Sequence, residues 1–361
     1  MRKLAPLALL LWLGVAGAAQ DQSKHDSTDP AACKTCKPAF DRAVQFVRAN
    51  FRNADVAGNA YAGLLFLMLN PKDNDLQACV QTASRAIGGR TGGNSNWYIA
   101  ISAYFLSEVY LRTKESSVQG ALVNAINTAA NTMEQTGGWG HSPGFWRTNN
   151  YHKKGGSRDL GMVTSMMYSA MINMKAGGID IPEALLRRVE KHLESISDGQ
   201  GFNYGSDNKV PDEAMGRGGY VFLGLTNAQM DNHPFYPKLV EGLKKRYKNV
   251  DKGHACASLH HYSVAAAMHR AGNYATFAAH WLDKLIAAQK KNGSISLGCD
   301  RGDSHADETA NAAVLAIILL LQKDGAFKAE GNKVEWKPAP AAPGGKTNAN
   351  PFSQKEPPEK K

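Results

Sequence analysis

The chain has 361 residues, of which 43% are hydrophobic and 20% are charged. A chain of this length can bury a large core, and its mixed composition excludes a collagen-like or wholly disordered protein. The net charge is +10, of which residues 1–3 contribute +2 and residues 326–361 contribute +3, leaving about +5 on the body. This mild basic bias suits an acidic polysaccharide or a phosphorylated ligand, but scattered surface lysine and arginine give the same total. We expect no nucleic-acid partner.

Residues 1–19 have the pattern of a secretory signal peptide. Arg2 and Lys3 precede an apolar run from Leu7 to Val15, and small residues suited to cleavage follow at 16–18. The run is too short to span a bilayer, so we expect no transmembrane segment. The sequence therefore predicts an exported protein, periplasmic or extracellular, with an N-terminal extension at 20–37.

Five cysteines are present, at positions 33, 36, 79, 256 and 299. Export permits disulfides, although an odd count leaves at least one thiol free or intermolecular. The Cys33-x-x-Cys36 segment lacks the following His of a haem attachment site and has no second close pair for zinc. We predict a structural disulfide there, with a redox pair as the alternative. A bridge between Cys256 and Cys299 is compatible with the sequence, which does not decide the pairing.

Apolar residues recur at three- and four-residue spacing along 38–325, in paired segments separated by polar or glycine-rich turns. In the clearest pair, the first helix places Leu122, Ile126 and Ala129 on one face and stops at Gly137-Gly138, and the second begins at Asp159. Repetition of this unit predicts six helical hairpins: 40–52 with 54–69, 76–87 with 97–111, 118–137 with 159–177, 182–196 with 219–230, 236–247 with 258–269, and 274–289 with 306–322.

The two helices of a pair differ in polarity. First helices carry a charged face, as at 185–191, whereas second helices such as 312–321 are apolar almost all round and must be covered on every side. We therefore predict an all-α fold, an (α/α)6 toroid whose second helices form the inner ring, with an open solenoid as the alternative. From 326 the chain is rich in Pro, Gly and Lys without apolar periodicity, which predicts a disordered tail over 326–361.

The repeats resemble those of the terpenoid-cyclase and protein-prenyltransferase family, in which an aliphatic helix, a Gln and a Gly-Gly-Trp-Gly turn precede a second apolar helix. The third repeat fits best, with Gln135 and the turn 137–140, and the sixth fits next, with Trp281 and Gln289. Segments 215–220 and 253–255 are also similar to a group of exported, uncharacterised bacterial toroid proteins. The resemblance implies the fold more than an activity, because this toroid serves cyclases, transferases, lyases and binding proteins. Trp139 and the Gln residues are expected to be structural, through a buried ring and hydrogen bonds to backbone carbonyls.

One segment, His305-Ala306-Asp307-Glu308-Thr309-Ala310, is similar to the Asp-x-Asp-Asp-Thr-Ala motif of proton-initiated terpene cyclases. The resemblance implies that Asp307 is the proton donor and that His305 and Glu308 tune it, although His305 replaces the first Asp of the motif. The competing interpretation is that Asp307 caps the last inner helix. Zinc-dependent prenyltransferases place two ligands where this chain has Arg217-Gly218-Gly219-Tyr220, so we expect no metal and no cofactor.

Polar side chains gather in the turns, which are predicted to share one mouth of the toroid and to suit a sugar or an oxyanion. The candidate ligand-binding residues are His141, Trp146, Asn150, Tyr151, Arg217, His254 and His260. The segment 149–152 also resembles elements of toroidal polysaccharide lyases, which implies that Asn150 and Arg217 neutralise a uronate while His152 or Tyr151 removes a proton.

The leading hypothesis is an exported terpenoid cyclase or prenyltransferase-like toroid that binds a small molecule in its central cavity, either an apolar compound or a glycan. A lyase acting on an acidic polysaccharide and a non-catalytic interaction scaffold are the alternatives. The sequence leaves the substrate, the presence of catalysis and the oligomeric state open.

Overall fold

The computed structural model describes residues 33–89, 94–143, 159–253, 256–297, 307–323 and 331–337. These residues form twelve α-helices and two short 3-10 helices, Phe51–Asn53 and Tyr247–Lys252, and contain no β-strand. The α-helices are α1 (Lys37–Asn50), α2 (Val56–Leu69), α3 (Asn74–Gly89), α4 (Ser95–Thr113), α5 (Ser116–Thr132), α7 (Gly161–Gly177), α8 (Glu183–Ser195), α9 (Gly216–Asn227), α10 (Phe235–Arg246), α11 (Ala257–Arg270), α12 (Tyr274–Ala288) and α13 (Glu308–Leu320).

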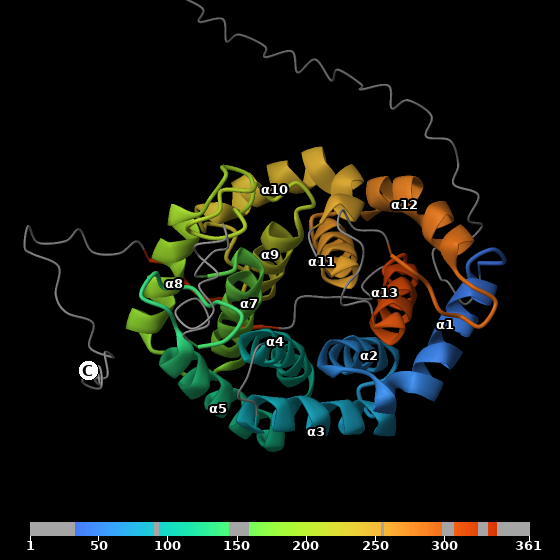
Figure 1. The fold of residues 1–361 in the computed structure, drawn as a ribbon, viewed down its shortest axis with the longest axis horizontal. Helices are drawn as coiled ribbons and strands as arrows, with labels where there is room; N and C mark the ends of the chain where they lie inside the picture. The colour runs from blue at the N-terminus through green and yellow to red at the C-terminus, as the bar shows by residue number, and fades with distance from the viewer. Residues whose placement is uncertain are drawn as a thin grey trace, which may run out of the picture.

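The helices are arranged in two concentric rings (Figure 1). The inner ring consists of α2, α4, α7, α9, α11 and α13, and the other α-helices lie outside it. Each inner helix packs against the next along the chain, and α13 packs against α2, which closes the ring. The predicted all-α toroid with an inner ring of second helices is confirmed.

Burial explains why the sequence contains two kinds of helix. The inner helix α7 is buried along nearly its whole length, because neighbouring helices cover it on every side. The outer helix α8 buries a stripe that includes Leu186, Val189 and Leu193 and exposes charged residues such as Lys191 and Glu194 on the opposite side. The distribution of polar residues around a helix therefore indicates whether the helix belongs to the inner or the outer ring.

The inner helices run in the same direction. Asp55 before α2 lies against Asp307 before α13, and Gly161 at the start of α7 lies against Arg217 at the start of α9. We call the end of the toroid where the inner helices begin the N-face and the opposite end the C-face. Turns that precede inner helices are thus brought together at the N-face, although they are far apart in the chain.

The turn after α5 holds the tryptophan of the best-fitting repeat. Trp139 is fully buried, and its Nε1 donates to the carbonyl of Ala129 at 2.9 Å. The structural interpretation of Trp139 is confirmed. The helix ends at Thr132, earlier than the predicted stop at 137, because Glu134 N donates to Gly138 O and closes a turn before the glycines.

The corresponding glutamine of the last repeat also has a structural role. Gln289 Nε2 donates to the carbonyls of Ala39 at 3.0 Å and Gly293 at 3.2 Å, so it ties α1 to the turn after α12. Trp281 in the same repeat donates from Nε1 to Tyr247 O at 2.8 Å. Both side chains therefore link a helix or turn to the backbone of a neighbouring segment.

Four fully buried tyrosines meet in the middle of the inner ring, and we call Tyr61, Tyr104, Tyr220 and Tyr262 the tyrosine layer. The hydroxyl oxygens of Tyr61 and Tyr220 are 2.6 Å apart, and those of Tyr104 and Tyr262 are 3.0 Å apart. Neighbouring rings pack with centroids 5.0 to 6.1 Å apart. The layer comes from α2, α4, α9 and α11, so it spans the lumen and separates the N-face from the C-face.

No disulfide is formed among the described cysteines, which are residues 33, 36, 79 and 256. The structural disulfide predicted for Cys33 and Cys36 is therefore not formed; instead the backbone N–H of Cys36 donates to Cys33 Sγ at 3.2 Å. The bridge considered between Cys256 and Cys299 stays a prediction, because Cys299 lies outside the described residues. None of the described helices combines the length and the apolar character needed to cross a membrane.

Candidate functional site

The described candidate residues lie at the N-face. They are Asp307, Glu308, His141, Arg217 and His260. The other candidates lie outside the described residues and stay predictions: His305, His152, Trp146, Asn150, Tyr151 and His254. The structure thus assembles part of the predicted constellation at one end of the toroid.

Asp307 is the N-cap of α13. Its Oδ1 accepts from the backbone N–H groups of Thr309 at 2.6 Å and Ala310 at 3.3 Å. Its Oδ2 accepts from the backbone N–H of Asp55 at 2.9 Å. The capping role is confirmed, and three backbone N–H groups donate to this one carboxyl group.

Asp55 is the partner that sequence reasoning missed. It caps α2 by accepting from Gly58 N at 2.7 Å, and its carboxyl group is close enough to that of Asp307 to hydrogen-bond with it. Gly58 permits this approach, because a Cβ there would lie 2.3 Å from Asp307 Oδ2. The available signal was an Asp immediately before an apolar helix, but the predicted helix began at Ala54 and enclosed it.

The two carboxyl groups are not equivalent. Asp55 is exposed as a residue, yet partial burial of its carboxyl group, followed by the negative charge of Asp307, raises the pKa of Asp55 above its ordinary value. Two carboxylates that share a site cannot both ionise easily. The carboxyl group of Asp55 therefore stays protonated to higher pH than that of an ordinary aspartate.

Glu308 follows Asp307 but turns outward. Its side chain is exposed, and Lys290 Nζ lies 2.7 Å from its Oε1. Among the described residues, this contact links Glu308 to the turn after α12. No group of three His, Cys, Asp or Glu side chains among the residues that the structure describes is placed to hold a metal ion.

Arg217 is buried at the start of α9 and holds the preceding loop. Its guanidinium donates to the carbonyls of Phe202 at 2.6 Å and Pro211 at 2.8 Å, and it lies 3.6 Å from Asp212 Oδ1. Asp212 in turn accepts from Gly218 N at 2.7 Å. This arrangement does not favour the lyase alternative, in which Arg217 would bind a uronate carboxylate.

The two described candidate histidines are also packed tightly. His260 on α11 is buried between two glycines: a Cβ at Gly216 would lie 2.1 Å from its Nδ1, and one at Gly253 would lie 2.3 Å from its Cδ2. His141 Nδ1 accepts from Trp97 Nε1 at 3.1 Å, which links the turn after α5 to α4. Among the described N-face residues, Asp55 is exposed and has a raised pKa, whereas Arg217 and His260 are buried.

A polar network lies beneath the tyrosine layer, toward the C-face. Glu108 is fully buried on α4, where its Oε2 accepts from Arg112 at 2.7 Å. Its Oε1 accepts from Asn173 of α7 at 3.1 Å and from Asn227 of α9 at 2.7 Å. Arg270 of α11 donates to Asn227 Oδ1 at 2.9 Å. Four inner helices are joined here by charged and amide groups.

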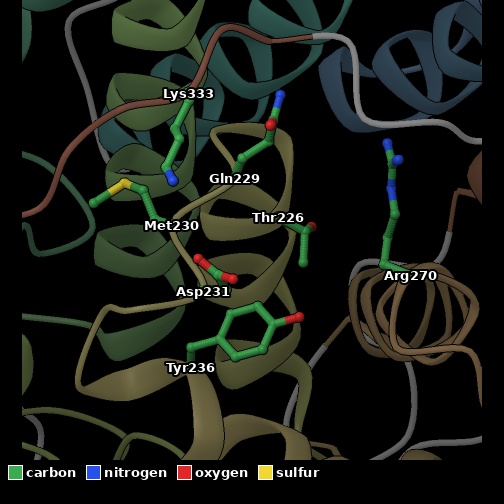
Figure 2. Close-up of a pocket in the computed structure, with 7 residues that line it drawn as sticks. All are labelled: Thr226, Gln229, Met230, Asp231, Tyr236, Arg270 and Lys333. Atoms are coloured by element: carbon green, nitrogen blue, oxygen red, sulfur yellow. The ribbon is translucent and has the colours of Figure 1, made fainter.

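A pocket of about 330 Å³ opens beside this network at the C-face. It is lined by Thr226, Gln229, Met230, Asp231, Tyr236, Arg270 and Lys333. Figure 2 shows that Lys333 and Arg270 come to it from different elements, one from the chain after α13 and one from the end of α11. Opposite charges and two hydroxyl groups give this pocket a mixed polar character.

Residues 331–337, which we call the strap, lie against the C-face although they belong to the segment predicted as a tail. Asn332 N donates to Ala176 O, and Val334 N donates to Ala228 O, each at 2.9 Å. Val334 is buried, and Trp336 packs on His233 with ring centroids 5.4 Å apart. The strap thereby bonds carbonyls at the ends of α7 and α9 that would otherwise lack partners.

With this geometry in hand, comparison with known families gives one assignment. Residues 39–320 match the model of a family described as Domain of unknown function (DUF6288). The chain belongs to this family. The match spans the toroid from α1 to α13. No curated protein gives a significant match.

Two solved structures similar in fold are of one enzyme, the type II terpene cyclase MstE from Scytonema. The apo structure is 12% identical, with a TM-score of 0.46, and the match covers 79% of this chain and 98% of that one. A variant of the same enzyme in complex with geranylgeranyl dihydroxybenzoate, its substrate, is also 12% identical, with a TM-score of 0.45 and coverage of 79% and 99%.

Proposed function

We propose that this protein binds an apolar small molecule at the N-face and that the Asp55–Asp307 pair serves there as a proton donor. The observation that carries the proposal is the pair itself: two carboxyl groups from opposite ends of the chain, in contact at the start of two adjacent inner helices. Export of the protein, expected from residues 1–19, is part of the same proposal.

Within the pair we assign the proton to Asp55. Asp307 accepts three backbone N–H bonds as a helix cap, whereas the raised pKa of Asp55 keeps its carboxyl group protonated to higher pH. This assignment moves the donor role from Asp307, where the motif resemblance placed it, to its partner. Asp307 then orients Asp55 and opposes its ionisation.

The tyrosine layer forms a fully buried aromatic floor across the lumen. Tyr61 lies about one helical turn after Gly58 on α2, so the aromatic floor lies directly below the carboxyl pair. A proton delivered from Asp55 to an alkene carbon forms a C–H bond with the π electrons and leaves a carbocation. Aromatic faces stabilise a neighbouring cation, and loss of a proton to water or to Asp55 completes an isomerisation without any cofactor.

The test uses the purified protein in D₂O with squalene and linear polyprenols as probes. We expect a rearranged product that has a different chromatographic retention time and has gained one deuterium per molecule. Asp55→Ser keeps the N-cap but removes the acid, and should slow the reaction by about 100-fold or more. The matched control is Asp41→Ser, an exposed carboxylate on α1, which should keep the wild-type rate.

A second variant distinguishes an acid from a cap. Asp307→Asn retains hydrogen-bonding atoms but removes the charge that raises the pKa of Asp55, so the residual activity should shift to lower pH. An Asp55→Ser variant with wild-type turnover contradicts the proposal. So does a wild-type protein that turns over none of these alkenes.

A further inference from the structure

The pocket at the C-face is open to solvent and is separate from the carboxyl pair of the N-face. Its volume of about 330 Å³ is at the lower end of the range for ligand pockets, which is roughly 300–1,000 Å³. Solvent reaches the polar side chains that line it, which are exposed at Gln229, Asp231 and Lys333 and half-buried at Thr226, Tyr236 and Arg270. A small polar molecule therefore has access to them.

The strap holds Lys333 at the pocket by hydrogen bonds on both sides of this residue. The backbone N–H groups of Asn332 and Val334 donate, each at 2.9 Å, to carbonyls at the C-terminal ends of α7 and α9. Gln229 Nε2 donates to Gly331 O at 3.0 Å. The backbone of Lys333 is thus fixed against the C-face, while its side chain remains exposed at the pocket.

Gln229 has a backbone conformation that usually belongs to glycine. Its φ is 53°, and the N–H of Met230 donates to Leu225 O at 2.9 Å, which closes the end of α9 as a Schellman motif. Glycine is preferred at this position because a side chain is strained there. The glutamine side chain holds the strap and lines the pocket instead. The pocket therefore explains this residue better than the helix end does.

The second cation of the pocket is anchored to the buried network. Arg270 donates to Asn227 Oδ1 at 2.9 Å, and Asn227 Nδ2 donates to Glu108 Oε1 at 2.7 Å. Burial lowers the pKa of Arg270 to about 10, and the negative charge of Glu108 opposes this change, so the guanidinium is a cation at neutral pH. A cation that is partly withdrawn from water gains more from an anionic partner than one at the open surface.

Hydroxyl and carboxylate groups lie between the two cations in the view of Figure 2, where Thr226 and Asp231 separate Lys333 from Arg270. The hydroxyl hydrogen of Thr226 is used in a bond to a carbonyl of α9, 3.0 Å away, so its oxygen offers lone pairs to a ligand. Burial, followed by the negative charge of Asp231, raises the pKa of Tyr236, so its hydroxyl keeps its proton as a donor. Neighbouring acceptors and donors suit ligand hydroxyl groups, which both donate and accept.

We propose that this pocket binds a hydroxylated monocarboxylate of monosaccharide size, such as a hexuronate. Lys333 and Arg270 bind the carboxylate, and ligand hydroxyl groups donate to Thr226 and Asp231. Two cations and one anion give the lining a charge of +1, which one carboxylate neutralises and a zwitterionic amino acid does not. The tyrosine layer separates this pocket from the N-face, so the inference does not depend on the proposed function there.

The test is isothermal titration calorimetry of the purified protein at low salt, with glucuronate and galacturonate as probes. Glucose keeps the hydroxyl groups without the charge, and acetate keeps the charge without the hydroxyl groups. We expect each of these two compounds to bind at least about 10-fold more weakly than the better uronate. Serine tests the zwitterion. Uronate affinity should fall as salt is added, because the carboxylate contacts are ionic.

Two variants assign the binding to this pocket. Lys333→Gln should weaken uronate binding by about 10-fold and leave glucose binding unchanged. Its matched control is Lys337→Gln, which alters an exposed lysine of the same strap outside the pocket and should bind like the wild type. Thr226→Val should weaken the binding of uronate but not of acetate. Melting temperatures close to that of the wild type show that the variants fold.

Four results overturn the proposal. Neither uronate binds the wild-type protein; acetate binds as tightly as the better uronate, which leaves charge as the only determinant; serine binds more tightly than either uronate; or Lys333→Gln binds uronate like the wild type, which places the binding elsewhere. None of these results bears on proton transfer at the N-face, so the two proposals fail separately.

Discussion

The hydroxyl groups of Tyr61 and Tyr220 lie 2.6 Å apart in the centre of the toroid, although α2 and α9 do not pack against each other as neighbours in the ring. Both side chains are fully buried. Their hydrogen bond therefore joins opposite walls of the lumen in a place where water cannot replace either partner.

The effects of replacing the two members of this pair should be less than additive. Tyr61→Phe leaves the Tyr220 hydroxyl without that partner and should lower the free energy of unfolding by about 1–3 kcal/mol. The double variant Tyr61→Phe, Tyr220→Phe should fall short of the sum of the single effects by about 1 kcal/mol. Urea unfolding of the four proteins measures the coupling, and strictly additive effects would contradict it.

Glu108 is expected to be the most sensitive residue of the C-face network. Glu108→Leu removes a buried charge that Arg112, Asn173 and Asn227 all contact, and should destabilise the protein by about 3–5 kcal/mol. Denaturant unfolding is the measurement. Glu241→Gln, which breaks an exposed ion pair with Lys245, is the control and should change stability little. If Glu108→Leu also changes the free energy of unfolding only slightly, Glu108 is not the most sensitive residue of the network.

Asp159 should make the fold sensitive to strong acid. Burial acts to raise its pKa, but hydrogen bonds from His192 and Ser206 outweigh burial and lower the pKa from 3.8 to about 2. Because the folded pKa lies below the unfolded one, this stability is present above the unfolded value and is lost as pH falls toward 2. The difference corresponds to about 2 kcal/mol. Urea unfolding across this range should show the loss in wild type and not in Asp159→Asn.

His261 should make the free energy of unfolding depend on pH in a higher range than Asp159 does. Burial lowers its pKa from 6.5 to about 4, while Nδ1 donates to Ala257 O at 2.9 Å. The unfolded chain binds this proton first on acidification, so stability present above 6.5 should fall by about 3 kcal/mol as pH drops to 4. His261→Asn retains a donor and should flatten the stability profile over that interval. An unchanged slope would show that other groups cause it.

The strap should stabilise the C-face. A Cβ at Gly331 would lie 2.5 Å from Asn227 O, and Val334 is buried. A chain ending before Gly331 loses two backbone hydrogen bonds and the burial of Val334, and its free energy of unfolding should fall by about 2–4 kcal/mol. A chain ending at Lys337 is the matched control. Equal melting temperatures for the two would mean that the strap contributes nothing.

The local chemistry of the repeats could be recognised before the structure. The inner helix α13 is apolar around its circumference, and α8 has one charged face, so their rings follow from polarity alone. The cap at Asp307 and the bonds of Trp139 and Gln289 to backbone carbonyls also involve groups close to a helix end, where unpaired donors and acceptors are predictable.

The contacts that make the candidate site were not predictable in this way. An inner helix that is apolar on all sides gives no signal for the direction of the lumen, so the tyrosine layer cannot be distinguished from other buried aromatic residues. Asp55 and Asp307 are each typical helix caps when considered alone, and Asp307 contributes to the raised pKa of Asp55 only because α13 packs against α2. Sequence by itself determined which segments are helical and which need complete burial, because those properties depend on neighbours in the chain. Ring closure decided which carboxyl groups and hydroxyl groups face one another, because hydrogen bonds and pKa shifts depend on distances across the fold.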